Sequence, residues 1–388
     1  MLPLAGVTVV ALEQAVAAPF ATRQLADLGA RVLKIERVAG GDFARGYDET
    51  VHGMSSYFVW LNRGKESVTL DIKDPEDRTI LDNMLACADV FVQNLVPGAM
   101  QRLGLHETAL RAKHPRLIIC SISGYGDRGP YGNKKAYDLL AQCEAGLLSV
   151  TGTPEFPSKA GISVADIAAG MYAYTGVLTA LYERERTGTG TSFEVAMLDA
   201  LGEWTSQPYF YANYGGTPPR RTYARHASIS PYGPYQAVDG AQVFIGVQNE
   251  REWSALCTHV LNRPDLAQDH RFRRNSSRLD NDAALRAIIE QTMSELTAEQ
   301  VVTRLDAHGI ANARMRTIDE FAQHPQLAAR DRWREVDSPV GPVRSLLPPV
   351  TMVDREAAMG AIPALGQHTN AIRAEFAPME AQPIMDQS

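Results

Sequence analysis

The fold is decided by residues 7–12 (Val-Thr-Val-Val-Ala-Leu), 19–29 (Pro-Phe-Ala-Thr-Arg-Gln-Leu-Ala-Asp-Leu-Gly) and 31–36 (Arg-Val-Leu-Lys-Ile-Glu). The first and third runs are short and rich in β-branched residues, which favours strands. The middle run begins with a proline and stops at Gly29, as helices often do. A strand, a helix and a strand in this order form a β-α-β unit with parallel strands and a right-handed crossover.

The same alternation continues downstream. Residues 67–72, 89–94 and 116–122 have the composition of further strands. Asp74 is the expected N-cap of a helix that begins at Pro75, and the apolar residues of this helix share one face. We therefore expect an α/β large domain built on an open, doubly wound, Rossmann-like parallel sheet.

The chain has 388 residues, which is too long for one ordinary core. Turn-rich segments predict its division into a large domain over residues 1–190 and 330–388, a linker over 191–224, and a smaller α+β domain over 225–320. Within the smaller domain, Thr297-Ala-Glu-Gln300 has the pattern of a capping box.

Composition excludes several classes of protein. The net charge is −7 and there is no run of Lys and Arg, so a nucleic-acid partner is not expected. We expect a cytoplasmic protein without a membrane partner, because the sequence shows neither a signal peptide nor about 18 successive uncharged apolar residues. The nine His residues lack ligand spacing, which argues against a metal site. No G-x-G-x-x-G follows the first strand, so a nicotinamide cofactor is not expected either.

Five cations lie at or just after the predicted strand ends: Arg37, Arg45, Lys73, Arg102 and Lys135. Ligands of open α/β sheets sit outside the carboxyl ends of the strands, where such cations would hold phosphates. The alternative for each is an ordinary solvated surface charge. The glycine-rich loop over residues 123–132 is either a ligand-binding loop or an irregular surface loop.

The segment Lys159-Ala-Gly-Ile-Ser-Val-Ala-Asp-Ile-Ala-Ala-Gly170 leads into a long apolar run over residues 167–181. That run predicts a buried helix with Asp166 at its beginning. Asp166 is therefore either an N-cap or a carboxylate nucleophile on a rigid support, and local sequence leaves both open. Tyr137 and Asp138 are the nearest thing to an acid/base pair.

Several motifs together resemble the family III CoA-transferases, which include formyl-CoA:oxalate and carnitine CoA-transferases and α-methylacyl-CoA racemase. The resemblance covers almost the whole chain and is carried by residues 25–37, Gly41-Asp42, 62–71, 92–94, Pro97-Gly98, 123–126, Tyr137-Asp138, 161–170, 187–190 and 365–369. It implies coenzyme A as a substrate, an interlocked homodimer, and Asp166 as the catalytic residue. The positions similar to CoA contacts or lining the same cleft are Gln14, Ala15, Val16, Arg37, Leu70, Lys73, Asn94, Leu95, Arg102, Lys135, Tyr137 and Asp138.

Two departures narrow the function that the resemblance implies. Formyl-CoA transferases carry a glutamine near position 16 and a tetraglycine lid, whereas this chain has Val16 and no such lid, so formyl-CoA and oxalate are not expected. The racemase branch has a catalytic histidine where this chain has Tyr137, and a tyrosine of pKa about 10 is a poor acid/base group at neutral pH. We expect CoA transfer; the alternatives are a 2-methylacyl-CoA racemase or epimerase and a non-catalytic acyl-CoA-binding protein.

The expected mechanism is covalent and passes through an aspartyl-acyl anhydride and an aspartyl-CoA thioester at Asp166. Backbone N–H groups at the start of its helix are expected to stabilise the oxyanion. The expected donor is a short acyl-CoA such as succinyl-CoA, and the acceptor a dicarboxylate such as itaconate, mesaconate, citramalate or malate. Arg45, Arg225 and His226 are candidates to bind its distal carboxylate, or else they contact solvent or a partner subunit.

Overall fold

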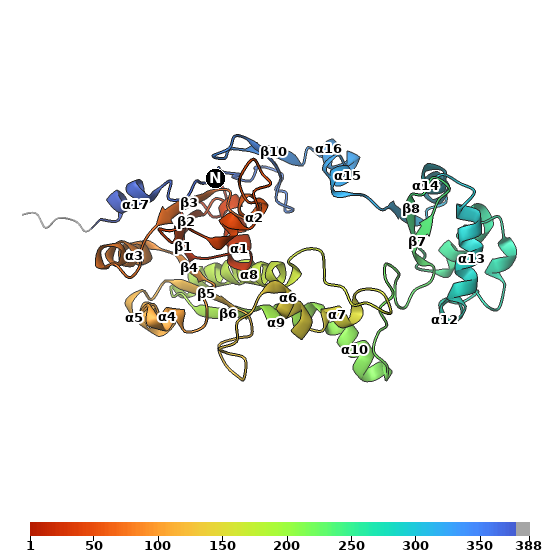
Figure 1. Cartoon of the computed structure of the whole chain (residues 1–388), viewed down its shortest axis with the longest axis horizontal. Helices are drawn as coiled ribbons and strands as arrows, with labels where there is room; N and C mark the ends of the chain where they lie inside the picture. The colour runs from red at the N-terminus through yellow and green to blue at the C-terminus, as the bar shows by residue number, and fades with distance from the viewer. Residues whose placement is uncertain (378–388) are drawn as a thin grey trace, which may run out of the picture. The chain divides into compact units, whose positions relative to one another are not determined.

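The computed structural model describes residues 1–377, and the chain divides into two compact units. The first unit contains residues 1–147 and 160–206 and the segment that begins at Ala329. Its sheet has six parallel strands in the order β3-β2-β1-β4-β5-β6 (Figure 1). The strands are β1 (Thr8–Leu12), β2 (Arg31–Glu36), β3 (Lys65–Thr69), β4 (Val90–Gln93), β5 (Ile118–Ser123) and β6 (Ser192–Ala196). The expected parallel α/β sheet is therefore confirmed, in the strand order of Rossmann folds.

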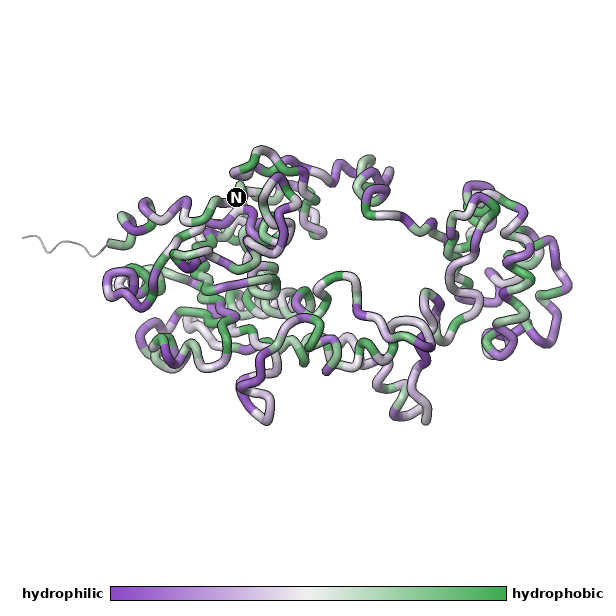
Figure 2. The backbone as a smooth tube through the Cα atoms, viewed as in Figure 1, coloured by the Kyte–Doolittle hydropathy of each residue, from purple (hydrophilic) through white to green (hydrophobic). Residues whose placement is uncertain are grey.

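Apolar side chains cover both faces of this sheet. Alternate residues of β1 point to opposite faces, so Val9 packs in one core and Val10 in the other. The first core lies against α1 (Ala17–Asp27), α8 (Val164–Thr187) and α9 (Met197–Trp204), and the second against α3 (Pro75–Cys87), α5 (Glu107–Lys113) and α17 (Thr369–Glu375). Figure 2 shows the hydrophobic residues gathered along these strands and helices. The sheet is covered on both sides, as a doubly wound fold requires.

The other elements of this unit are short. They are η1 (Phe43–Gly46), α2 (Ser56–Leu61), α4 (Ala99–Arg102), α6 (Asp138–Glu144) and the antiparallel pair β10 (Trp333–Val336) and β11 (Val343–Leu346). Asp74 caps α3 as predicted, because its side chain accepts hydrogen bonds from the N–H groups of Glu76 and Asp77.

The strand order reverses beside β1, which pairs with β2 on one side and β4 on the other. In open α/β sheets, ligands bind at the carboxyl ends of the strands at this switch point. Gln14 follows β1 there, and Asn94 follows β4.

Helix α8 has 24 residues and begins three residues before the predicted start at Ile167. Its length and composition would allow it to cross a membrane. Its glycines show that it packs inside the unit. A Cβ atom on Gly170 would lie 2.7 Å from the Ala17 carbonyl oxygen, and one on Gly176 would lie 2.5 Å from the ring of Phe193. These close contacts are those of a core helix.

The predicted linker over residues 191–224 was wrong in its first half. β6 pairs in register with β5, with Ser192 opposite Ile119, and α9 follows it directly. The turn signals at 187–190 end α8 rather than the domain, because Gly188 is the left-handed C-cap of that helix. Residues 148–159, predicted in the large domain, belong to the second unit.

The C-terminal segment returns to the first unit, as expected. The His368 N–H donates to the Ser67 carbonyl, and the Ser67 N–H donates to the His368 Nδ1 atom. The Thr69 N–H donates to the Thr369 hydroxyl at 2.9 Å. Arg31 is paired with both Glu66 and Glu375. The predicted return of residues 378–388 lies outside the described residues.

The second unit, residues 148–159 and 207–328, is the expected smaller α+β domain. It contains the antiparallel sheet β7-β8-β9 around a core that includes Trp253 and Phe272. The capping box at Thr297 and Gln300 is confirmed. The elements here are β7 (Tyr232–Gln236), β8 (Gln242–Gly246), β9 (Ala311–Arg314), α11 (Glu250–Ala255), η2 (Leu256–Val260), η3 (Pro264–Ala267), α12 (Asn275–Asp280), α13 (Asp282–Met293), α14 (Ala298–Ala307) and α15 (Ile318–Ala322), with α7 (Leu147–Val150), α10 (Ser206–Gly215) and α16 (Pro325–Ala329) where the chain passes between units.

Candidate active site

Asp166 is the third residue of α8, and another residue caps the helix. The Asp138 carboxylate accepts hydrogen bonds from the backbone N–H groups of Ala165, at 2.8 Å, and of Asp166, at 3.2 Å. The buried Gln142 amide donates to the other Asp138 oxygen at 2.6 Å. The interpretation of Asp166 as an N-cap was therefore wrong. Its half-buried carboxyl group accepts no hydrogen bond from any part of residues 1–377.

This setting makes the Asp166 carboxylate unusually basic. Burial, followed by the negative charge of Asp138, raises the pKa of Asp166 to about 7. A carboxylate without a cationic partner, beside a second carboxylate, is a typical functional-site arrangement. Its lone pairs are free for nucleophilic attack.

The N–H groups at the start of α8 are all occupied. The N–H groups of Ala165 and Asp166 donate to the Asp138 carboxylate. The N–H of Ile167 donates to the Ser163 carbonyl, and the N–H of Val164 donates to the Ile162 carbonyl. The expectation that these groups stabilise an oxyanion was therefore wrong.

Exposed tyrosines lie in the same neighbourhood. The rings of Tyr47 and Tyr57 meet edge to face at 5.4 Å, and Phe43 lies 5.7 Å from Tyr47. Burial, and then the charges of Asp42 and Asp166, raise the pKa of Tyr47 to about 12. Sequence reasoning missed Tyr47 and Tyr57. The available signal was their position soon after the Gly41-Asp42 motif.

The structure brings together the predicted residues at the switch point. The Gln14 N–H donates to Asn94 Oδ1 at 2.9 Å, and Asn94 Nδ2 donates to the Gln14 carbonyl at 2.8 Å. Ala15 and Val16 continue this loop into α1, and Leu95 follows Asn94. These two hydrogen bonds join the loops that follow β1 and β4, where a ligand of such a fold binds.

Four predicted cations are exposed, each after a different strand of the sheet. Arg37 follows β2, Lys73 follows β3, Arg102 follows β4 and Lys135 follows β5. Arg37 donates to the Gly41 carbonyl at 3.0 Å, and none of the four is ion-paired with a carboxylate within residues 1–377. Their charges are available to phosphates. Leu70, by contrast, is buried in the core at the end of β3.

Arg45 forms a salt bridge with Glu36. Its Nε and Nη2 atoms donate to the two carboxylate oxygens of Glu36 at 2.8 and 2.7 Å, and its guanidinium lies 3.6 Å from the ring centre of Phe58. A guanidinium held in this way has little charge left for a second carboxylate. The geometry therefore favours a structural role over the predicted contact with substrate.

The other two substrate candidates belong to the second unit. Arg225 donates to the Pro234 carbonyl at 2.9 Å and lies over the Tyr235 ring. His226 stacks on Tyr232 with ring centres 5.2 Å apart. Their role towards substrate stays a prediction.

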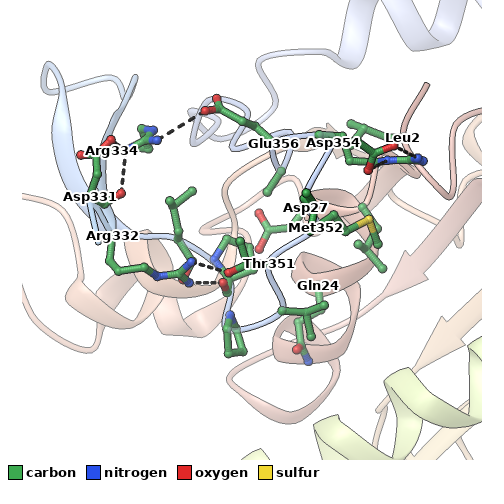
Figure 3. A pocket seen from close by; sticks show the side chains of 18 of the residues that line it. Leu2, Gln24, Asp27, Asp331, Arg332, Arg334, Thr351, Met352, Asp354 and Glu356 are labelled. Carbon is green, nitrogen blue, oxygen red and sulfur yellow. Dashed lines mark hydrogen bonds and ion pairs between the residues drawn. The ribbon is translucent and has the colours of Figure 1, made fainter. Parts of the chain in front are cut away.

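A cavity of about 590 Å³ lies elsewhere on the first unit, beside the end of α1 (Figure 3). It is lined by Gln24, Asp27, residues 330–332, Arg334 and residues 347–357, and by none of the predicted site residues. Several of its charged groups are paired, for example Arg334 with Asp331 and Glu356. No group of three metal-ligating side chains is found in the described part of the chain.

The chain is similar to known proteins over nearly its whole length. The model of CoA-transferase family III matches residues 4–369. The chain is 36% identical over 385 residues to the acetyl-CoA:oxalate CoA-transferase of Acetobacter aceti, covering 98% of this chain and 97% of that protein. It is 32% identical over 381 residues to the succinyl-CoA:glutarate CoA-transferase of Mus musculus, covering 97% and 86%. The crystal structure of a CAIB/BAIF family protein from Brucella suis has a TM-score of 0.85 and 33% identity, covering 97% of this chain and 99% of that one. The chain therefore belongs to CoA-transferase family III and is an enzyme that uses acyl-CoA.

Proposed function

We propose that this enzyme moves CoA from a short acyl-CoA such as succinyl-CoA to a small dicarboxylate, with Asp166 as the nucleophile. The observation that supports this most is the half-buried, unpaired Asp166 carboxylate, whose pKa is about 7. The relatives named for oxalate and glutarate also act on dicarboxylates.

The first half of the reaction transfers CoA to the enzyme. Asp166 attacks the thioester carbonyl of the donor, and CoA leaves as a thiolate, which gives a mixed anhydride. The thiolate then attacks the aspartyl carbonyl and expels the donor acid, which leaves an aspartyl-CoA thioester. The acceptor carboxylate attacks this thioester, and the same steps run in reverse. Because a carboxylate is a weak nucleophile, the bound CoA must hold the reacting groups in place.

The oxyanion needs donors other than those of α8. The first turn of α1 contains no acidic residue, and within the described chain the N–H groups of Ala17 and Ala18 have no partner. Since α1 packs against α8 at Gly170, we propose these groups as the oxyanion donors.

We propose that Arg37, Lys73, Arg102 and Lys135 bind the phosphates of CoA, and that the loop Gln14–Val16 with Asn94 and Leu95 binds the chain leading to the thioester. With Arg45 held by Glu36, the hydroxyl groups of Tyr47, Tyr57 and Tyr137 take its place as donors to the distal carboxylate.

The pH dependence tests the basicity of Asp166. Because the nucleophile must be ionised, kcat/KM should fall about tenfold per pH unit below pH 7. In Asp138→Asn, the amide oxygen still caps α8 but the neighbouring negative charge is gone. The fall should therefore begin at lower pH, by about one unit. An unchanged midpoint of the pH profile in Asp138→Asn would contradict the proposed effect of Asp138 on the pKa of Asp166. As a control, Asp82→Asn on the distant helix α3 should leave the pH profile of kcat/KM as in the wild type.

A panel of acceptors tests the proposed substrate class. With succinyl-CoA as donor, the acids oxalate, glutarate, itaconate, mesaconate, citramalate and malate are compared with butyrate and cinnamate. Oxalate is included because a 36% identical relative is named for it, contrary to the expectation drawn from Val16. At least one dicarboxylate should exceed both monocarboxylates in kcat/KM by tenfold or more, the effect of one charge-assisted contact. If a monocarboxylate is best, the class is wrong.

The homodimer and the cytoplasmic location remain predictions. So does the preference for transfer over racemisation, which rests on Tyr137 in place of the histidine.

A further inference from the structure

A network of buried charges lies beneath the loop that follows β1. Lys34 is 0% exposed, Asp42 1% and Glu13 2%. The network has three carboxylates and three cations: Glu13, Glu36 and Asp42, with Lys34, Lys65 and Arg45. Buried ion pairs contribute little net stability relative to apolar packing. A network of this size is therefore better explained by the geometry that it fixes.

Asp42 is held from several directions. Lys34 Nζ donates to its Oδ2 atom at 2.9 Å and also lies 3.3 Å from Glu13. The backbone N–H of Asp42 donates to Glu36 at 2.9 Å, and the N–H of Ala44 donates to Asp42 Oδ1 at 2.9 Å. The Asp42 carboxylate can therefore hardly move.

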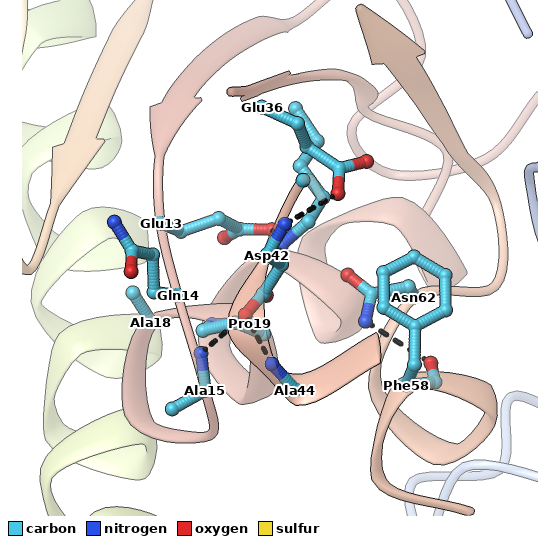
Figure 4. A network of polar contacts seen from close by, with 12 residues as sticks. Glu13, Gln14, Ala15, Ala18, Pro19, Glu36, Asp42, Ala44, Phe58 and Asn62 are labelled. Atoms are coloured by element: carbon cyan, nitrogen blue, oxygen red, sulfur yellow. Dashed lines mark hydrogen bonds and ion pairs between the residues drawn. The ribbon is translucent and has the colours of Figure 1, made fainter. Parts of the chain in front are cut away.

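The same Oδ1 atom accepts a hydrogen bond from the N–H of Ala15 at 3.0 Å (Figure 4). Ala15 has a φ of 61°, which is the left-handed region that a residue with a Cβ atom seldom adopts. Such strain persists only where the surroundings fix it. Here Asp42 holds the Ala15 N–H, and Asn94 holds both backbone groups of Gln14.

The turn at Ala15 sets the start of α1. Val16 is the N-cap of that helix, and Ala17 and Phe20 lie against Gly170 of α8. Gly170 is one helical turn after Asp166. The buried charges are thus linked through Asp42, Ala15 and the start of α1 to the helix that carries Asp166.

We propose that Asp42 is a positioning residue, which holds Ala15 in its left-handed turn so that the loop Gln14–Val16 is already shaped for acyl-CoA. This inference rests on the proposed CoA-binding role of that loop. A loop fixed before binding loses little entropy when the ligand binds.

Two variants test the proposal from opposite ends. Asp42→Ala removes the acceptor, whereas Ala15→Val leaves all six charges in place and puts a β-branched residue where φ is positive. Each should raise the Kd of CoA and the KM of acyl-CoA by about 10- to 100-fold, the usual effect of a small misplacement. Adding Ala15→Gly to Asp42→Ala should recover much of the affinity, because glycine adopts this φ without strain.

A control separates positioning from stability. Thr22 donates to Glu13 at 2.5 Å, and its hydroxyl group is not bonded to Ala15 or Asp42. Thr22→Val should lower the melting temperature and leave the Kd of CoA unchanged. Calorimetry is done below the melting temperatures of all variants, and if Asp42→Ala does not fold, Ala15→Val alone decides.

The possible failures are distinguishable. If the wild type binds CoA and Ala15→Val binds it equally well, the positioning role is refuted while the proposed function stands. If the wild type neither binds CoA nor transfers it, the proposed function fails, and this inference fails with it.

Discussion

Replacing Asp166 with alanine is expected to reduce CoA transfer at least about a thousandfold, because the group that forms both covalent intermediates is lost. The Kd of CoA should change little, since the proposed phosphate contacts are made by other residues. Initial rates with saturating succinyl-CoA and the best acceptor, together with calorimetry, measure both effects. A variant that kept more than about a thousandth of the activity would rule out Asp166 as the nucleophile.

Replacing the same residue with asparagine should not destabilise the fold at neutral pH. In the folded chain, the pKa of Asp166 is about 7, against about 4 in an unfolded chain, so the folded state retains the proton between these values. The stability that this proton contributes is present below pH 4 and is lost as pH rises through 7. Asp166→Asn should therefore gain about 1–2 kcal/mol over the wild type between pH 5 and pH 8, after allowance for its partial exposure. Loss of activity with gained stability would distinguish a chemical role from a structural one.

Replacing Arg63 with methionine is expected to cost about 3–5 kcal/mol in the free energy of unfolding, because the buried Asp27 carboxylate loses both of its short ionic hydrogen bonds and keeps only Arg23 at 4.0 Å. Arg63 Nε and Nη2 donate to the two oxygens of Asp27 at 2.8 and 2.7 Å, and both side chains are at most 4% exposed. Arg63 also donates to the Leu346 carbonyl, which ties β11 to α1. Denaturant unfolding at pH 7 measures the loss.

An exposed pair with the same geometry is the control. Arg263 donates to both oxygens of Asp265 at 2.8 and 2.7 Å, but the two side chains are 51% and 60% exposed. Arg263→Met should therefore leave the free energy of unfolding nearly unchanged. Equal losses in the two variants would show that burial is not the source of the effect.

The first five strands of the large unit were predictable, because each has a local pattern of apolar residues. β6 was not, because its five residues Ser-Phe-Glu-Val-Ala lie at the sheet edge and are only partly apolar. Edge strands need fewer apolar residues, so periodicity identifies them poorly. The start of α8 was also missed, since its cap comes from Asp138, 28 residues before Asp166.

The sequence predicted which residues belong to the site, but not how their side chains are paired. The family resemblance predicted that Gln14 and Asn94 both contact CoA, and in the structure they are joined because both follow strands that meet at the switch point. The pairing of Arg45 with Glu36 was not predictable, since a strand residue and a loop residue nine positions apart can point in many directions. The aromatic contacts of Tyr47 depend on the turn after Asp42, which no local pattern specifies.

Chemical trapping on the wild-type enzyme tests the role of Asp166 most directly. The enzyme is incubated with succinyl-CoA without acceptor, then treated with hydroxylamine and digested. Mass spectrometry of the peptide that contains Asp166 should show a hydroxamate on that residue, and the signal should vanish when acceptor is added before the hydroxylamine or when Asp166→Asn is used. A fully active enzyme whose Asp166 peptide stays unmodified, or that carries the hydroxamate on another carboxylate, would contradict the proposed covalent mechanism.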